Sequence, residues 1–173
     1  MFHRCDRPVK LGSYKRRLNG GGVRELPHSR SLRRGRFSPA EQIYLLTMVT
    51  LDRSRVFSEL LAAREVVKAM HQPSIVSAVE TLAFVVMPDH VHWLMQLKDA
   101  VNLAEAVRRF KAKVSLALGC PVWQRGFHDH ALRGDEDVVV AALYIVANPV
   151  RAGLVQRVGD YAHWDAVWLG NDV

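Results

Sequence analysis

Cysteine is scarce in this 173-residue chain, and long apolar runs are missing. Two cysteines, Cys5 and Cys120, are too few for a disulfide framework, so we expect a reducing compartment. The longest apolar run, residues 138–147, is about half of the roughly 20 residues that a membrane span needs. No apolar segment follows the early arginines, so no secretory signal is expected, and no glycine-rich loop has nucleotide-binding spacing. Disulfide-rich secreted, membrane-spanning and P-loop proteins are therefore not indicated.

Acidic residues are scarce only in the first part of the chain. The net charge is +7, but residues 1–36 hold 11 Lys and Arg against 2 Asp and Glu, whereas residues 37–173 carry a net −2. The first segment has few large apolar residues and a Gly20-Gly21-Gly22 hinge, so we expect a flexible basic arm before a folded domain at 37–173. Such an arm can contact nucleic-acid phosphates through counterion release. A solubilising tail or an overlong translation start is the alternative.

The hydrophobic pattern of residues 37–173 alternates between strand and helix periods. It predicts strands at 44–51, 76–87, 90–97 and 127–133, and helices at 54–72, at 102–119 and from 135 to about 147. Pro88-Asp89 is a turn dipeptide that makes a tight hairpin of the second and third strands. The order β-α-β-β-α-β predicts an α+β fold of the ferredoxin-like split βαβ type. Two helices should cover one sheet face, which leaves the other face for chemistry or for the additional helix.

Two histidines interrupt the apolar stretch FVVMPDHVHWLMQL, residues 84–97. Side chains alternate along a strand, so His90 and His92 should share one face while Val91 and Trp93 pack under the helices. Two imidazoles on one face can converge on a metal ion. Taken alone, the pattern is weak, and packing histidines are the simpler interpretation.

A second pair, His128 and His130, occurs in FHDHALR. Asp129 between them would face the side covered by helices, which is awkward for an acid, and the pair lies near a strand edge. We therefore interpret His130 as a structural residue or a support for the ligands, and not as a primary ligand.

Tyr144 is the candidate nucleophile, although burial in an apolar helix is the simpler interpretation. Asn148 follows four residues later, and residues at this spacing share one helix face. Pro149 disfavours helical dihedrals at Asn148, which should therefore lie at the end of the helix and reach back. No serine has the context of a catalytic triad.

Three segments, MPDHVHWLMQL, VWQRGFHDHALR and YIVANPVRAGLV, resemble successive motifs of the REP-associated tyrosine transposases, a single-tyrosine branch of the HUH nucleases. The resemblance covers roughly residues 37–165, in order and spacing, and DYAHWDAVW is similar to the family's C-terminal segment. The resemblance implies that His90 and His92 bind a metal, that Tyr144 is the nucleophile and that Asn148 is the third ligand. The central motifs show no departure from the family pattern, whereas the basic arm lies outside it.

The resemblance further implies cleavage of single-stranded DNA near palindromic-repeat hairpins through a 5′-phosphotyrosine intermediate, with Mg²⁺ or Mn²⁺ as cofactor. A bacterial cytoplasmic protein associated with the nucleoid is expected, without a membrane partner, as a monomer or a homodimer. Candidate DNA contacts are basic residues off the apolar helix stripe or near the tyrosine motifs: Arg108, Arg109, Lys111, Lys113, Arg125 and Arg151.

Two alternatives stay open at this point. The first is an HUH nickase for replication or mobilisation, which would use the same His90, His92 and Tyr144. The second is a non-catalytic ferredoxin-like domain that binds nucleic acid. Such domains bind through aromatic residues on an exposed sheet face, and Trp93 is predicted on the covered face.

Overall fold

An antiparallel sheet of five strands organises the part of the chain that the computed structural model describes, residues 41–98, 101–133 and 136–169. The strand order is β4-β1-β3-β2-β5. The strands are β1 Ile43–Val49, β2 Val79–Met87, β3 His90–Leu97, β4 His128–Ala131 and β5 Trp164–Ala166. The α-helices are α1 Leu60–Met70, α2 Pro73–Val76, α3 Leu103–Leu118, α4 Val138–Val146 and α5 Asn148–Arg151. Short 3₁₀ turns occupy Leu51–Arg53, Val56–Ser58, Val158–Asp160 and Val167–Leu169. The predicted basic arm, residues 1–36, lies outside the described residues.

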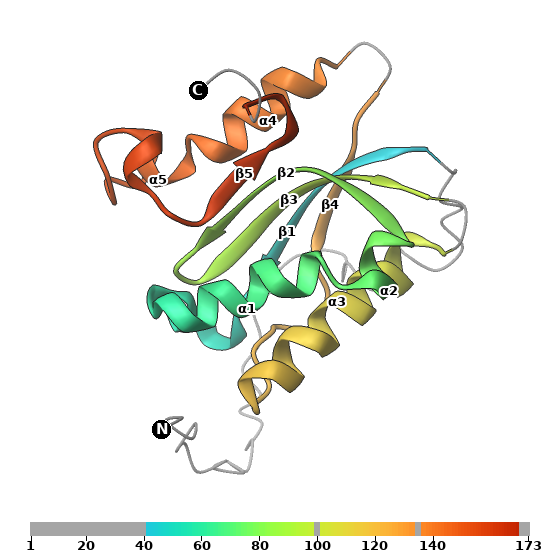
Figure 1. Ribbon diagram of the computed structural model, residues 1–173, viewed down its shortest axis with the longest axis horizontal. Helices are drawn as coiled ribbons and strands as arrows, with labels where there is room; N and C mark the ends of the chain where they lie inside the picture. Colours follow the sequence, from blue (N-terminus) through green and yellow to red (C-terminus); the bar gives the residue numbers. More distant parts are fainter. Residues whose placement is uncertain (1–40, 99–100, 134–135, 170–173) are drawn as a thin grey trace, which may run out of the picture. The chain divides into compact units, whose positions relative to one another are not determined.

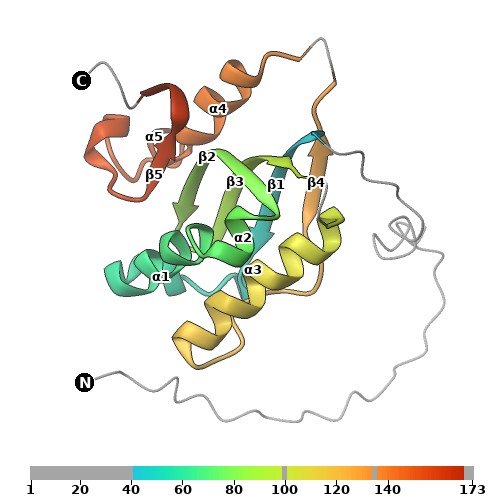
Figure 2. The ribbon, with the colours of Figure 1, turned by 45° about the vertical axis from the view of Figure 1, so that its right-hand side comes forward.

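Helices cover the two sheet faces unequally. Helices α1, α2 and α3 lie on one face, and α4 lies on the other, as Figures 1 and 2 show. On the first face, Trp93 packs against Phe110 of α3 with ring centroids 4.8 Å apart, within a buried apolar cluster. On the second face, Leu94 belongs to a smaller buried cluster with Ile145 and Val146 of α4. Alternation along β3 therefore divides its side chains between two cores.

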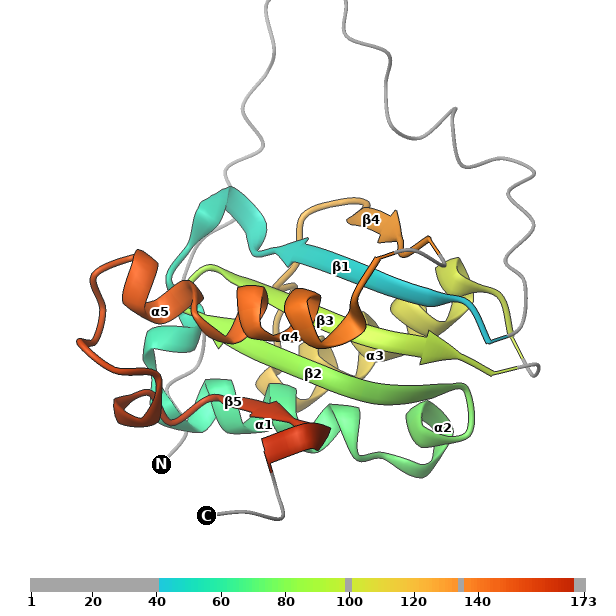
Figure 3. The same ribbon diagram turned by 90° about the horizontal axis from the view of Figure 1, so that it is seen from above.

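Helix α4 covers only part of its sheet face. It lies over β2 and β3 (Figure 3), and its apolar cluster reaches Ile43 and Leu45 of β1 but not Thr47. Thr47 of β1 is only half-buried and His128 of β4 is exposed. The uncovered strip borders the strand that carries the two histidines, so the second face keeps an accessible area next to α4.

The α+β fold and the order β-α-β-β-α-β are confirmed. Met87 pairs with His90, so Pro88 and Asp89 form the predicted two-residue turn. The helix predicted at 54–72 is shorter, because a 3₁₀ turn precedes Leu60 and a separate short helix begins at Pro73. The predicted second strand accordingly begins later, at Val79.

The strand β5 is a feature that the hydrophobic pattern did not predict. It has only three residues, Trp164–Ala166, and it pairs antiparallel with β2 at the sheet edge. A segment this short cannot establish an alternating pattern. Within the described residues, no helix is both long enough and apolar enough to traverse a lipid bilayer.

Candidate functional site

His90 and His92 lie side by side on the sheet face that α4 partly covers. Their ring centroids are 4.8 Å apart and the rings are nearly perpendicular, at 86°. Val91 and Trp93 are fully buried on the opposite face, as strand alternation predicts. The two imidazoles are therefore close enough to bind one small ligand together.

Each imidazole has its Nδ1 atom engaged by a neighbouring side chain. His90 Nδ1 lies 2.6 Å from Asp89 Oδ1, and because an ionised carboxylate can only accept, the imidazole donates. His92 Nδ1 lies 2.9 Å from Thr47 Oγ1, in the adjacent strand β1. A hydrogen bond at Nδ1 orients the ring and leaves Nε2 as the atom that can bind a metal.

The histidines are supported by a network at the end of β1. Arg53 donates to the second oxygen of Asp89, at 3.1 Å. Thr50, fully buried, donates its backbone N–H and its hydroxyl to the Asp89 carbonyl, both at 2.9 Å. Asp52 and Arg53 both adopt left-handed backbone conformations, with φ of 53° and 52°. Such conformations persist where the surrounding structure over-determines them, and here they direct Arg53 toward the hairpin turn.

The protonation states around this pair suit a metal ligand. Burial, together with the charges of His90 and Arg151, lowers the pKa of His92 to about 4. His92 is thus neutral at pH 7, as a metal-binding imidazole must be. Burial raises the pKa of Asp89, but hydrogen bonds and charges from His90 and Arg53 outweigh it, so the net pKa is lowered. Asp89 is therefore ionised when it accepts from His90.

Tyr144 is exposed on α4, with 59% of its surface accessible, so it is not part of the core. The guanidinium carbon of Arg151 lies 3.8 Å from the centre of its ring. Asn148 is the first residue of α5, and a single residue separates it from the end of α4. Pro149 occupies the first turn of α5, where its missing N–H is not needed. Asn148 donates Nδ2 to the Ile145 carbonyl at 2.8 Å and accepts at Oδ1 from Arg151 Nη2 at 2.5 Å. The tyrosine, amide and guanidinium groups thus form one cluster.

Packing places this cluster at the histidine end of the sheet. Ile145 and Val146 of α4 share a buried cluster with Val85 and Met87 of β2. Val85 and Met87 are the cross-strand partners of His92 and His90, respectively. The charge of Arg151 is also among the causes that lower the pKa of His92. The structure therefore gathers His90, His92, Tyr144, Asn148 and Arg151 around one end of β2 and β3.

The donor set of this site is small. Among the described residues, no group of three or more His, Cys, Asp and Glu side chains could hold a metal ion. Two imidazoles with oriented rings and the amide oxygen of Asn148 make a mixed nitrogen and oxygen set that leaves coordination positions for substrate oxygens. These residues fit a divalent ion that keeps open coordination positions.

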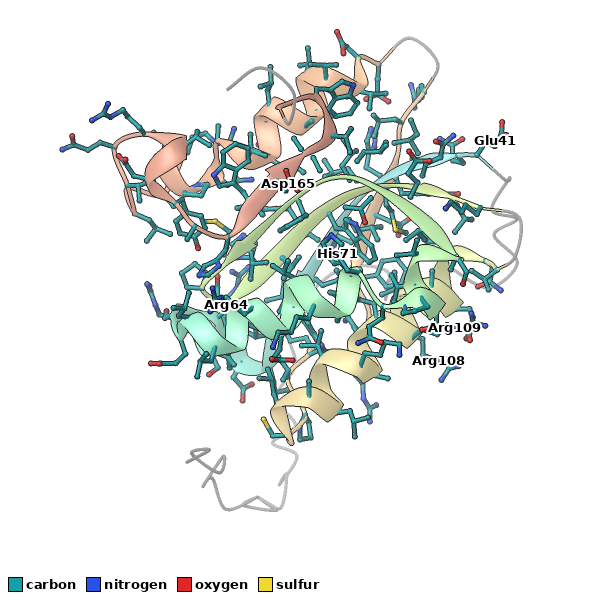
Figure 4. The ribbon with its side chains drawn as sticks, viewed as in Figure 1. Glu41, Arg64, His71, Arg108, Arg109 and Asp165 are labelled. Carbon is teal, nitrogen blue, oxygen red and sulfur yellow. The ribbon has the colours of Figure 1, made fainter. Side chains whose placement is uncertain are left out.

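The predicted DNA contacts Arg108, Arg109, Lys111 and Lys113 belong to α3, which covers the other sheet face. Arg108 and Arg109 both donate to Glu105, at 2.7 and 2.8 Å, and α3 covers the sheet face opposite α4 (Figure 4). These hydrogen bonds lower the pKa of Glu105 to about 2. Lys111 donates to the Gln124 carbonyl at 3.0 Å and to the Gly126 carbonyl, and Lys113 is half-buried. Lys111 thus bonds to the loop whose Gln124 also bonds to Val49 of β1, whereas Arg108 and Arg109 lie on the helix that covers the face opposite the histidines.

The remaining candidates surround β1 and β4. Arg125 is exposed beside Gln124, whose N–H donates to the Val49 carbonyl, and Val49 pairs with His90. His130 Nε2 lies 2.9 Å from Glu136 Oε1, away from the histidine pair, which agrees with a structural interpretation. His128 of β4 pairs with Thr47 of β1, and Thr47 pairs on its other side with His92. His128 is therefore a further imidazole on the histidine face.

Sequence reasoning did not single out Asp89, Thr47 or Arg53 for the site. Asp89 was interpreted only as a turn residue, although an acid directly before the first histidine could have indicated a supporting role. Thr47 and Arg53 have no such local pattern, because their contacts depend on the pairing of β1 with β3 and on the conformation of the turn that follows.

Two neighbouring histidines thus lie on one sheet face, and the tyrosine-bearing helix α4 covers part of that face. The family model described as "Transposase IS200 like" matches residues 40–141, more than half of the chain, and the chain belongs to this family. The matched range includes His90 and His92 and ends before Tyr144.

Individual relatives point to one branch of the family. The chain is 29% identical over 142 residues to a Haemophilus influenzae protein that carries the name REP-associated tyrosine transposase, covering 70% of this chain and 77% of the relative. It is 33% identical over 84 residues to the REP-associated tyrosine transposase of Escherichia coli, covering 47% of this chain and 51% of that protein. A solved REP-associated tyrosine transposase bound to a REP hairpin is similar in structure, with a TM-score of 0.61, 26% identity, and coverage of 75% and 79%.

Proposed function

We propose that this protein is a metal-dependent endonuclease and transposase that cleaves single-stranded DNA near palindromic-repeat hairpins and rejoins it through a 5′-phosphotyrosine. The observation that carries the proposal is the placement of an exposed tyrosine and an amide, on α4 and α5, at the histidine end of the sheet. The sheet order, with the long helices α1 and α3 and the short α2 on one face, supports a ferredoxin-like split βαβ core for the domain at 37–173. The Escherichia coli and Haemophilus influenzae relatives and the hairpin-bound structure support the choice of substrate.

Tyr144 supplies the nucleophile in this proposal. Its Oη attacks the phosphorus, the bond from phosphorus to the 3′-oxygen breaks, the phenolic proton is lost, and the departing 3′-oxygen ends as a hydroxyl. A free phenol has a pKa near 10, so only about one in a thousand is ionised at pH 7 and the site must favour the phenolate. The covalent link conserves a phosphodiester bond, so a 3′-hydroxyl can later reverse the step without ATP.

His90, His92 and Asn148 would hold the divalent ion, Mg²⁺ or Mn²⁺. When bound, the ion would neutralise charge on the scissile phosphate and stabilise the charge that develops on its oxygens. The chain's own contribution is to keep both imidazoles oriented through Asp89 and Thr47 and to keep His92 neutral. Arg151, beside the tyrosine ring, would offer a cation to the same phosphate.

Asp89→Asn should weaken Mn²⁺ binding about tenfold, because the residue that orients a metal-binding imidazole typically contributes tenfold to a hundredfold to affinity. The asparagine oxygen can still accept from His90 but carries no charge. Isothermal titration with Mn²⁺ measures the change. Asp165→Asn, the same change at an exposed position of the edge strand β5, is the matched control and should bind like the wild type. Equal affinities of the two variants would show that Asp89 has no part in the site.

The basic arm is proposed to contact DNA phosphates, because residues 1–36 carry a net +9. Deleting residues 1–36 should lower hairpin affinity and flatten the dependence of log K on log salt, since each lost phosphate contact reduces the slope by roughly 0.7 for single strands. Fluorescence anisotropy at several salt concentrations measures both quantities. Unchanged affinity and slope would remove the arm from the interface.

The direct test of the proposed function uses a labelled single-stranded hairpin with flanking sequence, incubated with Mn²⁺ or Mg²⁺. A denaturing gel should show a protein–DNA species and a shortened strand, and both should vanish with EDTA. Strand-transfer products from two repeat-bearing substrates would separate a transposase from a nickase for replication or mobilisation. Hairpin binding without any metal-dependent cleavage would favour the non-catalytic domain, although Trp93 is fully buried and unavailable for base stacking. A protein acting on chromosomal repeats would reside at the bacterial nucleoid.

A further inference from the structure

Arg151 contacts both groups that the proposed reaction requires from α4 and α5. Its guanidinium carbon lies 3.8 Å from the centre of the Tyr144 ring, and Nη2 donates to Asn148 Oδ1 at 2.5 Å. The planar guanidinium suits both contacts, because it stacks on aromatic rings and donates in a fixed fork. One side chain therefore couples the position of the phenol to that of the amide.

The amide oxygen that accepts from Arg151 is the atom proposed to bind the metal. The other polar atom of Asn148, Nδ2, donates to the Ile145 carbonyl at 2.8 Å, and this bond fixes the orientation of the amide. A cation hydrogen-bonded to Oδ1 opposes the approach of a divalent ion to the same oxygen, since like charges repel. In the arrangement observed, Arg151 occupies the amide oxygen of Asn148 that would bind the metal.

We infer that Arg151 is a positioning residue that is released by phosphate: without DNA it holds Tyr144 and Asn148 in a resting arrangement, and a DNA phosphate draws its guanidinium off the amide oxygen. This inference rests on the proposed function. Arg151 is exposed, so a phosphate can reach it. Hydrogen bonds from a guanidinium to an anionic phosphate are stronger than those to a neutral amide, so the exchange is favourable. Metal binding at Asn148 is thereby coupled to the arrival of substrate.

The coupling predicts a gain of metal affinity when Arg151 loses its charge. Arg151→Gln should bind Mn²⁺ about tenfold more tightly than the wild type without DNA, because a charged hydrogen bond no longer has to be broken. Mn²⁺ titration followed by electron paramagnetic resonance measures this affinity without any turnover. Arg157→Gln removes an exposed charge of the same segment and should bind like the wild type.

A double-mutant cycle with Asn148→Ala separates release of the amide from simple removal of charge. The tenfold gain should disappear when Arg151→Gln is made in the Asn148→Ala background, because the amide oxygen is absent from both members of that pair. A gain of the same size in both backgrounds would mean charge repulsion alone and would overturn the inference. Equal or weaker Mn²⁺ binding by Arg151→Gln would overturn it too.

The DNA side of the coupling is tested in the Tyr144→Phe background, which keeps the aromatic ring and prevents covalent chemistry. A short single-stranded oligonucleotide should raise Mn²⁺ affinity in this variant and raise it less when Arg151→Gln is added. An equal rise in both proteins would contradict release by phosphate. A different result would contradict the proposed function itself. That result is an unchanged Mn²⁺ affinity in a double variant with His90→Ala and His92→Ala.

Discussion

Tyr144→Phe is expected to reduce the covalent protein–DNA species at least roughly a thousandfold, while hairpin affinity stays within about twofold. The substitution removes one oxygen and keeps the ring that stacks on Arg151. Tyr144 is largely exposed, so the change should not disturb the packing of α4. The adduct is measured on a denaturing gel with Mn²⁺ and labelled hairpin DNA, and affinity by anisotropy.

Tyr161→Phe is the matched control for this experiment. It is the same chemical change at a tyrosine whose Oη donates to the Val86 carbonyl at 2.7 Å. The control should lose some stability, about 1 kcal/mol for one hydrogen bond, and should keep the adduct. An adduct that persists in Tyr144→Phe would remove Tyr144 as the nucleophile.

His92→Ala is expected to reduce metal-dependent cleavage by roughly a hundredfold to a thousandfold, because loss of the ion removes several kcal/mol of charge stabilisation at the phosphate. His90→Ala should behave alike, since the two rings are 4.8 Å apart and share the ion in the proposed site. Both variants should lose Mn²⁺ binding and keep hairpin binding. Single-turnover cleavage and Mn²⁺ titration measure the two effects.

His71→Ala controls for loss of an imidazole elsewhere. His71 is exposed at the end of α1, and its Nδ1 lies 2.9 Å from the Val67 carbonyl. This variant should cleave like the wild type. Melting curves confirm that each protein is folded. If His92→Ala cleaved at the wild-type rate with Mn²⁺, the histidine pair would be a packing feature and the metal proposal would be wrong.

The parts of the site that lie close together in the sequence were predictable. His90 and His92 share a face because strand side chains alternate, and Tyr144 and Asn148 are close because they are four residues apart along nearly continuous helices. The hairpin turn at Pro88-Asp89 followed from its residues alone. Each of these relations needs only local geometry.

The contacts that complete the site depend on tertiary structure. Thr47 reaches His92 only because β1 pairs with β3 in one register, and that register is not encoded in either strand alone. The link from Arg151 to His92 depends on the packing of α4 over β2 and β3. The charge pattern of α3 located Arg108 and Arg109 outside its apolar stripe, but their shared hydrogen bonds to Glu105 were not predicted.

The central claim is that Tyr144 itself becomes joined to DNA, and peptide mapping of the adduct tests it most directly. Trypsin should release residues 134–151 as one peptide, which contains a single tyrosine and no serine or threonine. After nuclease trimming, mass spectrometry should find a nucleotide joined through its 5′-phosphate to Tyr144. A nucleotide on any other residue of the chain, or cleavage that never leaves a protein-linked DNA end, would contradict the account.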